Sequence, residues 1–378
     1  MLDTSLYVNI KNLENNISLI KSLKFSKNKT VIAVIKSDAY GHGLIPVAET
    51  LFRNGINFFG IINVGEAAAI LSNIPGAKLL MLKGVPEEDI KEAMDLDLSI
   101  AVISLDYLKM LLGKARTTRK RAKIHIKYDS GMNRLGLNEN EMRSAAEIIN
   151  ENKKFLDAEG FFSHLSSAGS DSEYTDFQIN NYKKMASLLE RRGIKPTYKH
   201  ISASSSLLNC GITHDYSNAV RPGISIYGIN PNSNLCNIPY DSSAIGLKPL
   251  MTLKSYVIQV KKVLKGGFVS YNNTYKAPRD MAIAIVSAGY DNGIPRLLSN
   301  KGRFLINGKF AGITGIVTMN LTMADVTGIE GVKAGDEVII AGNSGKKEIT
   351  LEEIASAAGT IPYEICLNFG KSNKRIYL

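Results

Sequence analysis

The stretch Val31-Ile-Ala-Val-Ile-Lys36-Ser-Asp-Ala-Tyr40-Gly-His-Gly43 decides how the rest of the chain is interpreted. Its apolar, β-branched beginning is typical of a strand that is buried on both faces. The strand ends at Lys36, the glycines that follow suit a turn with positive φ, and a helical pattern runs over residues 44–53. A desolvated lysine amine has a lowered pKa and can attack a carbonyl group. The alternative is a lysine that ends the strand and simply reaches water.

Strand-like and helical runs alternate along the chain up to about residue 237. Eight strand-like runs recur, at residues 31–35, 58–62, 78–82, 99–103, 123–127, 157–164, 198–201 and 219–221. Helical patterns follow most of them, at residues 44–53, 65–71, 87–94, 107–115, 139–150 and 176–191. This alternation predicts an α/β fold with a parallel sheet, and eight repeats predict a closed, TIM-like (β/α)₈ barrel. An open, doubly wound sheet is the alternative, but no G-x-G-x-x-G follows the first strand.

From about residue 238 the pattern changes to short β-rich runs separated by turn residues. These runs cover residues 251–263, 281–287, 303–306, 313–317 and 337–341, and only residues 351–358 keep a helical pattern. Turn signals such as Asn307-Gly308 lie between them. We therefore predict a barrel domain over residues 1–237 and an all-β domain over residues 238–378. The short strand near residues 6–10 is a candidate to pack on the second domain.

Composition and charge narrow the classes of function. The net charge of +11 raises the question of nucleic acid, but the densest basic cluster, residues 116–123, has no interleaved aromatic residues and is typical of a solvated helix end. No apolar run approaches the ~20 residues of a membrane span, and the N-terminus lacks a signal-peptide pattern. Three separated cysteines form no CxxC pair. We expect a cytoplasmic protein without metal that binds neither nucleic acid nor membrane.

Polar side chains stand at the ends of several predicted barrel strands, where barrels of this kind gather their functional groups. They are Lys36, Lys127 with Asp129, His164, His200 and Arg221. A histidine at a strand end can also be a hydrogen-bonded packing residue. In a closed barrel, however, five such ends face one cavity, which favours a shared site.

The loops after these strand ends resemble the motifs of the alanine racemase family. Residues 31–43 resemble the cofactor-lysine motif A-V-V-K-A-x-A-Y-G-H-G, and Lys127-Tyr-Asp-Ser-Gly-Met-Asn-Arg134-Leu-Gly136 resembles K-x-D-T-G-M-x-R-L-G. His200-Ile-Ser-Ala-Ser204 is similar to H-x-A-N-S, with alanine in place of asparagine. Val220-Arg221-Pro-Gly223-Ile224-Ser-Ile-Tyr227-Gly228 is similar to V-R-x-G-I-x-x-Y-G. The resemblance covers nearly the whole chain.

The resemblance implies that Lys36 holds pyridoxal 5′-phosphate (PLP) as a Schiff base. Tyr40, Ser204 and the backbone N–H groups of Gly223 and Ile224 would then bind its phosphate.

Three further strand-end residues are assigned to the cofactor by the same resemblance: His164, His200 and Arg221. Arg221 would face the pyridine nitrogen and, because arginine keeps its proton, would leave that nitrogen unprotonated. The cofactor would then delocalise a carbanion less strongly, which limits side reactions.

A second base is implied by Val269-Ser-Tyr271-Asn, which resembles the family motif V-S-Y-G. In the family this tyrosine reaches the active site of the other subunit, so the resemblance implies a homodimer. Racemisation by two bases needs one base on each face of a planar intermediate. Lys36 and Tyr271 would be those bases, and His164 would connect Tyr271 to Arg221.

The resemblance implies that the substrate carboxylate is bound by Arg134 and by the backbone N–H of Met319 from the neighbouring subunit. Arginine suits this task because its guanidinium stays charged. Lys127 is often carbamylated in the family and would then steady Arg134. The alternative is that Arg134 simply pairs with Asp129.

Two C-terminal motifs depart from the family pattern. G-R-V-C-M-D-Q appears here as Gly315-Ile-Val-Thr-Met319-Asn320-Leu, and Lys371 replaces a tyrosine that touches the phosphate and narrows the substrate pocket. Lys371 either takes over the phosphate contact or points to solvent. The resemblance therefore implies an alanine racemase that supplies D-alanine for peptidoglycan, with serine or another small amino acid as the alternative substrate. Two functions of other classes compete with it: that of a PLP decarboxylase and that of a non-catalytic PLP-binding protein.

Overall fold

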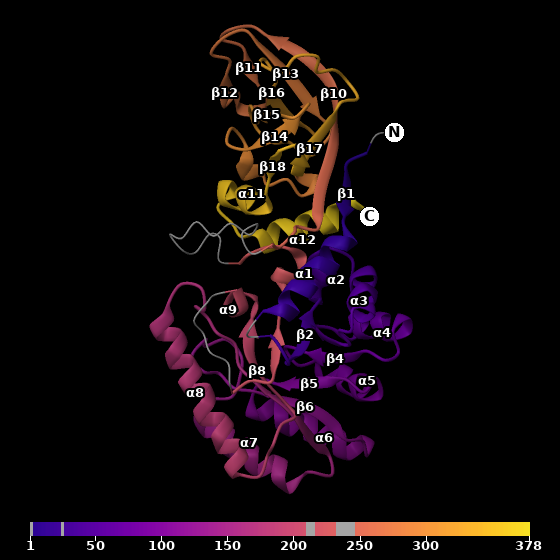
Figure 1. Ribbon diagram of the computed structural model, residues 1–378, viewed down its shortest axis with the longest axis vertical. Helices are drawn as coiled ribbons and strands as arrows, with labels where there is room; N and C mark the ends of the chain where they lie inside the picture. The colour runs from indigo at the N-terminus through magenta and orange to yellow at the C-terminus, as the bar shows by residue number, and fades with distance from the viewer. Residues whose placement is uncertain (1–2, 24–25, 209–215, 232–245) are drawn as a thin grey trace. The chain divides into compact units, whose positions relative to one another are not determined.

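The structure is a computed structural model that describes residues 3–23, 26–208, 216–231 and 246–378 (Figure 1). Backbone contacts divide the chain into two compact units. One comprises residues 13–39 and 44–248, and the other comprises residues 1–12, 40–43 and 249–378. The predicted domain boundary between residues 237 and 238 lies outside the described residues.

The first unit is built on a closed barrel of eight parallel strands. They are β2 (Thr30–Val34), β3 (Phe58–Ile61), β4 (Lys78–Met81), β5 (Ser99–Val102), β6 (Ala122–Lys127), β7 (Leu156–Phe162), β8 (Tyr198–Ala203) and β9 (Ala219–Arg221). Each pairs with its neighbours in sequence order, and β9 pairs with β2 to close the ring. The predicted (β/α)₈ barrel is confirmed, and the open-sheet alternative is wrong.

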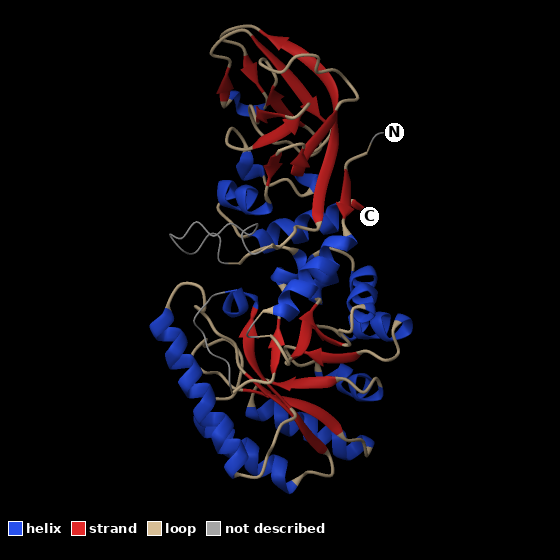
Figure 2. Ribbon diagram, viewed as in Figure 1, coloured by secondary structure: helices blue, strands red, loops and turns tan. Residues whose placement is uncertain are grey.

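Helices lie around the outside of these strands (Figure 2). They are α1 (Ile10–Ser22), α3 (Leu44–Arg53), α4 (Val64–Asn73), α5 (Ile90–Asp95), α6 (Leu105–Thr118), α7 (Glu139–Glu151) and α8 (Ser172–Arg191). Helix α7 shows why they form where they do. Asn138 and Glu141 make a capping box at its start, and its buried residues recur with helical spacing from Met142 to Ile149. No described helix is long and apolar enough to span a membrane.

The second unit contains a nine-stranded sheet and a two-stranded one. The larger sheet has β1 (Ser5–Val8), β10 (Met251–Val263), β13 (Met281–Val286), β14 (Arg303–Ile306), β15 (Lys309–Gly312), β16 (Thr322–Asp325), β17 (Glu337–Ser344), β18 (Lys347–Ile349) and β19 (Lys374–Tyr377). Strand β1 pairs with β10 and β19. Strands β11 (Phe268–Val269) and β12 (Tyr275–Lys276) form the smaller sheet. Asn307 and Gly308, both at positive φ, close the predicted hairpin of β14 and β15.

Two expectations about the second unit are wrong. Residues 313–317 do not form a strand, because Gly315 adopts a φ of 80° and only Ile313 makes an isolated bridge. A further helix, α12 (Pro362–Ser372), follows α11 (Leu351–Ala358). Its signals are Gly359, which ends α11 in the left-handed conformation, and Pro362 in the first turn of α12.

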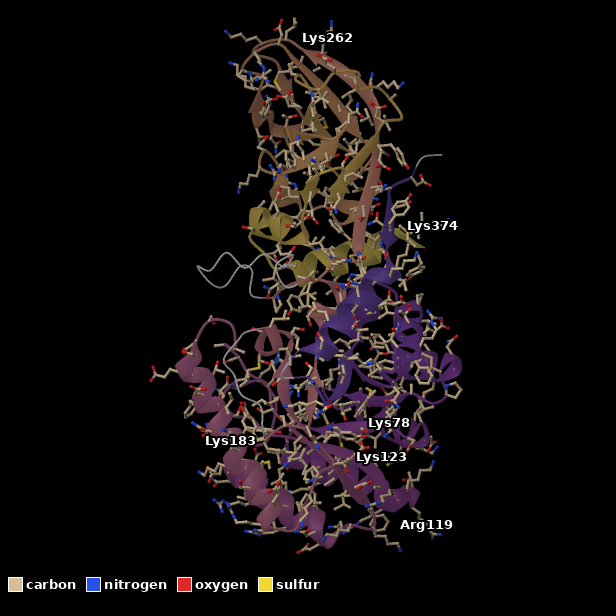
Figure 3. All side chains as sticks on the ribbon, viewed as in Figure 1. Lys78, Arg119, Lys123, Lys183, Lys262 and Lys374 are labelled. Carbon is tan, nitrogen blue, oxygen red and sulfur yellow. The ribbon has the colours of Figure 1, made fainter. Side chains whose placement is uncertain are left out.

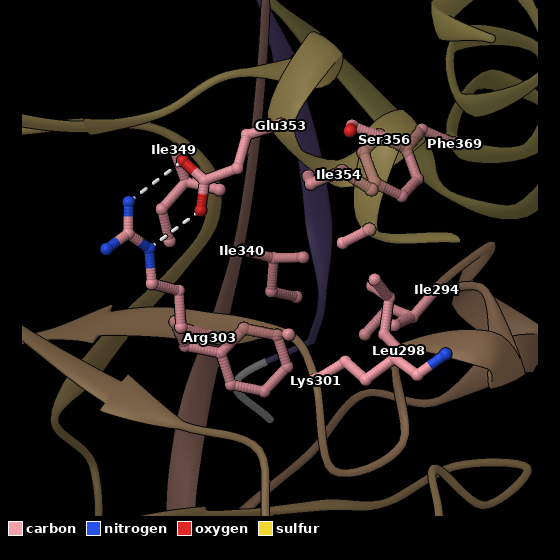
Figure 4. Close-up of a pocket in the computed structure, with 13 residues that line it drawn as sticks. Ile294, Leu298, Lys301, Arg303, Ile340, Ile349, Glu353, Ile354, Ser356 and Phe369 are labelled. Atoms are coloured by element: carbon pink, nitrogen blue, oxygen red, sulfur yellow. Dashed lines mark hydrogen bonds and ion pairs between the residues drawn. The ribbon is translucent and has the colours of Figure 1, made fainter. Parts of the chain in front are cut away.

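A cavity of about 460 Å³ in the second unit lies beside α11 (Figure 4). Apolar side chains such as Leu298 and Phe369 line it, together with Lys301 and the ion pair of Arg303 with Glu353. None of the predicted site residues lines this cavity, so it is separate from the candidate site.

Basic side chains are distributed over many elements rather than gathered in one motif (Figure 3). In the predicted cluster at residues 116–123, Arg121 pairs with Asp157, Lys120 with Asp95 and Lys123 with Asp97. This cluster therefore carries less uncompensated charge than its sequence indicates.

Candidate active site

The turn that carries Lys36 has an unusual backbone. Its element, α2 (Lys36–Tyr40), is not a right-handed helix, because residues 37–40 adopt φ values of 55°, 55°, 52° and 54°. A left-handed turn of non-glycine residues costs roughly 1–2 kcal/mol per residue, and such strain concentrates at functional sites.

Two carboxylates hold this turn in place. Asp38 Oδ1 accepts from the backbone N–H of Leu44 at 2.7 Å, which fixes the start of α3. Glu66 accepts from the N–H groups of Asp38 and Ile62, both at 3.2 Å. The role of Glu66 was missed, because its position three residues after the N-cap Asn63 indicates only a helix start.

Lys36 lies in an environment that favours the neutral amine. Burial lowers its pKa, the positive charge of Arg134 lowers it further, and Glu66 opposes both effects in part. A neutral amine is the form that attacks a carbonyl group, so this environment is compatible with the reactive interpretation of Lys36, which stays a prediction.

Lys127, at the end of β6, is buried, whereas Lys36 is half-buried. Its Nζ lies 5.4 Å from the centre of the Phe162 ring. Burial and the charges of Arg221 and Arg134 lower its pKa to about 8. Phe162 was missed as a site residue, since it is one apolar residue within a predicted strand.

The loop after β6 is organised by Asp129. Its carboxylate accepts from the N–H groups of Gly131 at 3.0 Å and Asn133 at 3.1 Å. Arg134 is exposed and, among the described residues, forms no ion pair with Asp129. The alternative of an Arg134–Asp129 pair is wrong, because the carboxylate binds N–H groups of its own loop instead.

Arg221, at the end of β9, is buried in a cage of acceptors. Its Nη2 donates to the carbonyl oxygens of Ser163 at 2.7 Å and Ile201 at 3.2 Å. Its Nη1 donates to the carbonyl of His200 at 3.0 Å and to the Nδ1 atom of the same residue. Burial lowers the pKa of Arg221 to about 10, so the side chain stays charged at neutral pH.

Two strand-end histidines adjoin Arg221 and are neutral. His164 Nδ1 lies 3.4 Å from Arg221 Nη2, and burial together with the arginine charge lowers the pKa of His164 to about 3. The same causes lower the pKa of His200 well below its usual value. Both ring nitrogens of His200 are occupied, by Arg221 and by His125. Its contact to the cofactor, predicted from the sequence, would therefore be indirect.

The predicted phosphate ligands of the barrel converge. Ser204, the first residue of α9 (Ser204–Leu208), accepts through Oγ from the N–H of Gly223 at 2.8 Å and of Ser225 at 3.3 Å. Ile224 begins the short 3₁₀ turn η2 (Ile224–Tyr227) between them. The N–H of Gly223 is thus already bonded to Ser204 in this structure, so a bound phosphate would replace the hydroxyl as its acceptor.

Tyr40, in the second unit, lies next to a close contact with α12. A Cβ atom on Gly370 would be 2.1 Å from the carbonyl oxygen of Gly41, so only glycine fits at position 370. Arg375 donates to the carbonyl oxygens of both glycines, at 2.9 and 2.7 Å. Burial raises the pKa of Tyr40, which keeps its phenol protonated. Lys371 follows Gly370 and is exposed.

Tyr271 projects from the second unit and is 67% exposed. It begins the turn η3 (Tyr271–Asn273), where Asn272 adopts a φ of 60° at the position of the glycine in V-S-Y-G. Asparagine tolerates this conformation better than most residues. Ser270 donates to the carbonyl of Ile316 at 2.9 Å, which ties Tyr271 to the loop that carries the exposed Met319.

Comparison with known proteins identifies two matching families along the chain. The model of the alanine racemase N-terminal domain matches residues 8–231, and that of the alanine racemase C-terminal domain matches residues 250–377. Alanine racemase 2 of Caldanaerobacter subterraneus is 35% identical over 378 residues, covering 99% of this chain and 95% of that protein.

Solved structures agree with this comparison. An alanine racemase from D-cycloserine-producing Streptomyces lavendulae superposes with a TM-score of 0.91 at 28% identity, covering 100% of this chain and 97% of that one. The alanine racemase of Bacillus anthracis with bound L-Ala-P gives a TM-score of 0.89 at 30% identity, with coverage of 100% and 95%.

Proposed function

The chain belongs to the alanine racemase family, and we propose that it is a PLP-dependent isomerase that interconverts L- and D-alanine. The observation that carries the proposal is the arrangement of three groups on one barrel. Lys36, Ser204 and Arg221 lie at or just after the ends of β2, β8 and β9, where they would supply a reactive amine, an anion site and a buried cation.

The residues present fit PLP. Lys36 supplies the amine that would hold its aldehyde carbon, while Ser204 and the N–H groups of Gly223 and Ile224 would bind the phosphate, with Tyr40 as a further donor. Arg221 donates to backbone carbonyls and to an imidazole. It would face the pyridine nitrogen. When bound, PLP withdraws electrons from the α-carbon of an amino acid and so acidifies its α-proton.

The protein's own residues would then move that proton. Lys36 Nζ, with its lowered pKa, accepts it on one face, and the partner subunit's Tyr271 donates a proton on the other. Arg134 and the backbone N–H of the partner subunit's Met319 bind the substrate carboxylate. Arg221 donates towards His164 Nδ1, which leaves the proton of this neutral histidine on Nε2, where it can be donated to the tyrosine oxygen.

The proposed enzyme is a cytoplasmic homodimer that supplies D-alanine for peptidoglycan. Tyr271, Met319 and Leu321 are exposed apolar side chains of the second unit, and they support a dimer interface there. The test is incubation of the PLP-loaded protein with a panel of L-amino acids, followed by chiral chromatography. We expect D-alanine as the main product. Faster racemisation of serine would favour the alternative substrate, and loss of carbon dioxide without racemisation would overturn the proposal.

We also propose that Lys127 is carbamylated and steadies Arg134. Carbon dioxide adds only to a neutral amine, and a pKa of about 8 means that the neutral fraction of Lys127 rises as the pH rises towards 8. The added carboxylate would compensate the neighbouring guanidinium groups, with release of one proton. In ¹³C-bicarbonate we expect a carbamate signal that grows between pH 6.5 and 8 by roughly tenfold or more. A signal that persists in Lys127→Arg would contradict this assignment.

Lys371 is proposed to bind the cofactor phosphate in place of the missing tyrosine. It follows Gly370, which contacts Gly41 beside the other proposed phosphate ligand, Tyr40. Lysine binds phosphate as a flexible point charge, so Lys371→Ala should weaken PLP binding by ~1.5–3 kcal/mol. Lys371→Tyr should restore binding and shift preference towards alanine over serine by refilling the pocket.

Equilibrium dialysis measures the PLP affinity of the unsubstituted protein, Lys371→Ala and Lys371→Tyr. Lys374→Ala serves as the control, because this exposed lysine lies close by on β19. Equal PLP affinity in Lys371→Ala and in the unsubstituted protein would leave Lys371 as a solvent-facing residue.

A further inference from the structure

A continuous row of hydrogen-bonded polar side chains runs through the barrel interior behind Arg221. His200 Nδ1 faces Arg221 Nη1, and His200 Nε2 lies 2.9 Å from His125 Nδ1. The other nitrogen of His125 lies 3.3 Å from Glu159 Oε2, which also accepts from the hydroxyl of Ser99. Four barrel strands, β5 to β8, and the end of β9 therefore contribute one residue each.

The donors in this row all point the same way. A guanidinium can only donate hydrogen bonds, so the Nδ1 atom of His200 must accept from Arg221. The proton of the neutral His200 ring must therefore lie on Nε2. That proton is donated to His125 Nδ1, so the proton of His125 also lies on Nε2 and is donated to Glu159. Each neutral imidazole is thus fixed in one tautomer, between a guanidinium at one end and a carboxylate at the other.

The packing around the row keeps the rings in these positions. His125 and His200 are fully buried. The His200 ring stacks on Phe162 with centres 4.9 Å apart, and His125 stacks on Tyr198 at 6.0 Å. A Cβ atom at Gly160 would lie 2.1 Å from His125 Nδ1, so only glycine leaves room for the ring.

We propose that Glu159 and His125 are positioning residues that fix the tautomer of His200 and thereby the orientation of the Arg221 guanidinium. This inference rests on the proposed function, in which Arg221 faces the pyridine nitrogen of PLP. A carboxylate touching Arg221 directly would compensate its charge at the site. By placing the carboxylate two imidazoles away, the row orients the guanidinium with neutral acceptors and leaves its charge directed at the cofactor.

The charges around Glu159 support its role as the anionic end. Burial raises the pKa of this carboxyl, but hydrogen bonds from His125 and Ser99 oppose burial, and the pKa is lowered overall. The charge of Lys78 also interacts with Glu159. The side chain is only 17% exposed, so its carboxylate is held by the protein more than by water.

The test reads histidine tautomers in the full chain, with and without PLP. Long-range ¹⁵N–¹H spectra of ¹⁵N-histidine-labelled protein report which ring nitrogen carries the proton, and His125→Asn and His200→Asn assign the two signals. We expect both imidazoles to be neutral and protonated on Nε2. A His200 proton on Nδ1, or an imidazolium at neutral pH, would overturn the proposal whether or not the chain racemises alanine.

Substitutions at Glu159 complete the test. In Glu159→Leu we expect His125 to lose its single tautomer and kcat to fall about tenfold, equivalent to about 1.4 kcal/mol, with little change in KM. Glu159→Gln keeps an oxygen that can accept from His125, so both histidines should keep their tautomers and kcat should fall less than in Glu159→Leu. Asp157→Asn, on the same strand but paired with Arg121, should behave as the unsubstituted protein. Unchanged tautomers and kcat in Glu159→Leu would show that the row does not position Arg221.

Discussion

Lys36→Ala is expected to purify without the near-visible absorbance of protein-bound PLP and to lose racemisation by at least about four orders of magnitude. Loss of a general acid–base group typically costs about 10²–10⁴-fold in rate, and Lys36 is also the proposed covalent anchor. The lowered pKa of this half-buried amine is the structural reason proposed for both roles. Absorbance spectra and chiral chromatography measure the two losses separately.

The attachment point can be located directly. Borohydride reduction of the PLP-loaded protein should fix the pyridoxyl group on Lys36, as read by mass spectrometry of a digest. Lys83→Ala is the matched control, since its charge interacts with Lys36 but its loss should leave PLP bound. The pyridoxyl mass on another lysine, above all the buried Lys127, would remove Lys36 from its assigned role.

The barrel could be predicted because its strands are buried on both faces and therefore form apolar runs at regular intervals. The end of each run also located the polar residues, so Lys36, Lys127 and Arg221 were found without knowledge of the fold. The left-handed turn at residues 37–40 could not be predicted, because Ser, Ala and Tyr do not favour positive φ. Contacts of Asp38 and Glu66 hold that turn.

Non-local partners explain most of what the sequence could not reveal. The run Ala-Lys-Ile-His-Ile-Lys predicts β6 correctly, but the partners of His125 come from β7 and β8, 34 and 75 residues away. Helix α12 was missed for a similar reason, since Gly370 weakens the helical pattern. The structure shows that this glycine is needed for the close contact with Gly41.

Tyr271→Phe is expected to fold and retain PLP but to lose about two to four orders of magnitude in racemisation rate. Tyr271 is 67% exposed, so removing its hydroxyl should leave packing within the second unit unchanged. Two-base racemisation needs a proton donor opposite Lys36, and the substitution removes only that donor. Tyr275→Phe is the matched control, because its hydroxyl contacts Met281 Sδ at 3.7 Å within the same unit. Full activity in Tyr271→Phe would exclude this tyrosine as the second base.

Mixing two inactive variants tests whether Tyr271 is delivered across a dimer. In a heterodimer of Lys36→Ala and Tyr271→Phe subunits, one site combines two substituted residues, and the other combines an intact Lys36 with an intact Tyr271. If subunits exchange at random, half of the dimers are heterodimers with one working site of two. Activity should therefore rise to about one quarter of the unsubstituted level, because each working site contains both proton-transfer residues. No recovery after verified exchange would place both bases in one subunit, because a site built within a single chain cannot be complemented by its neighbour.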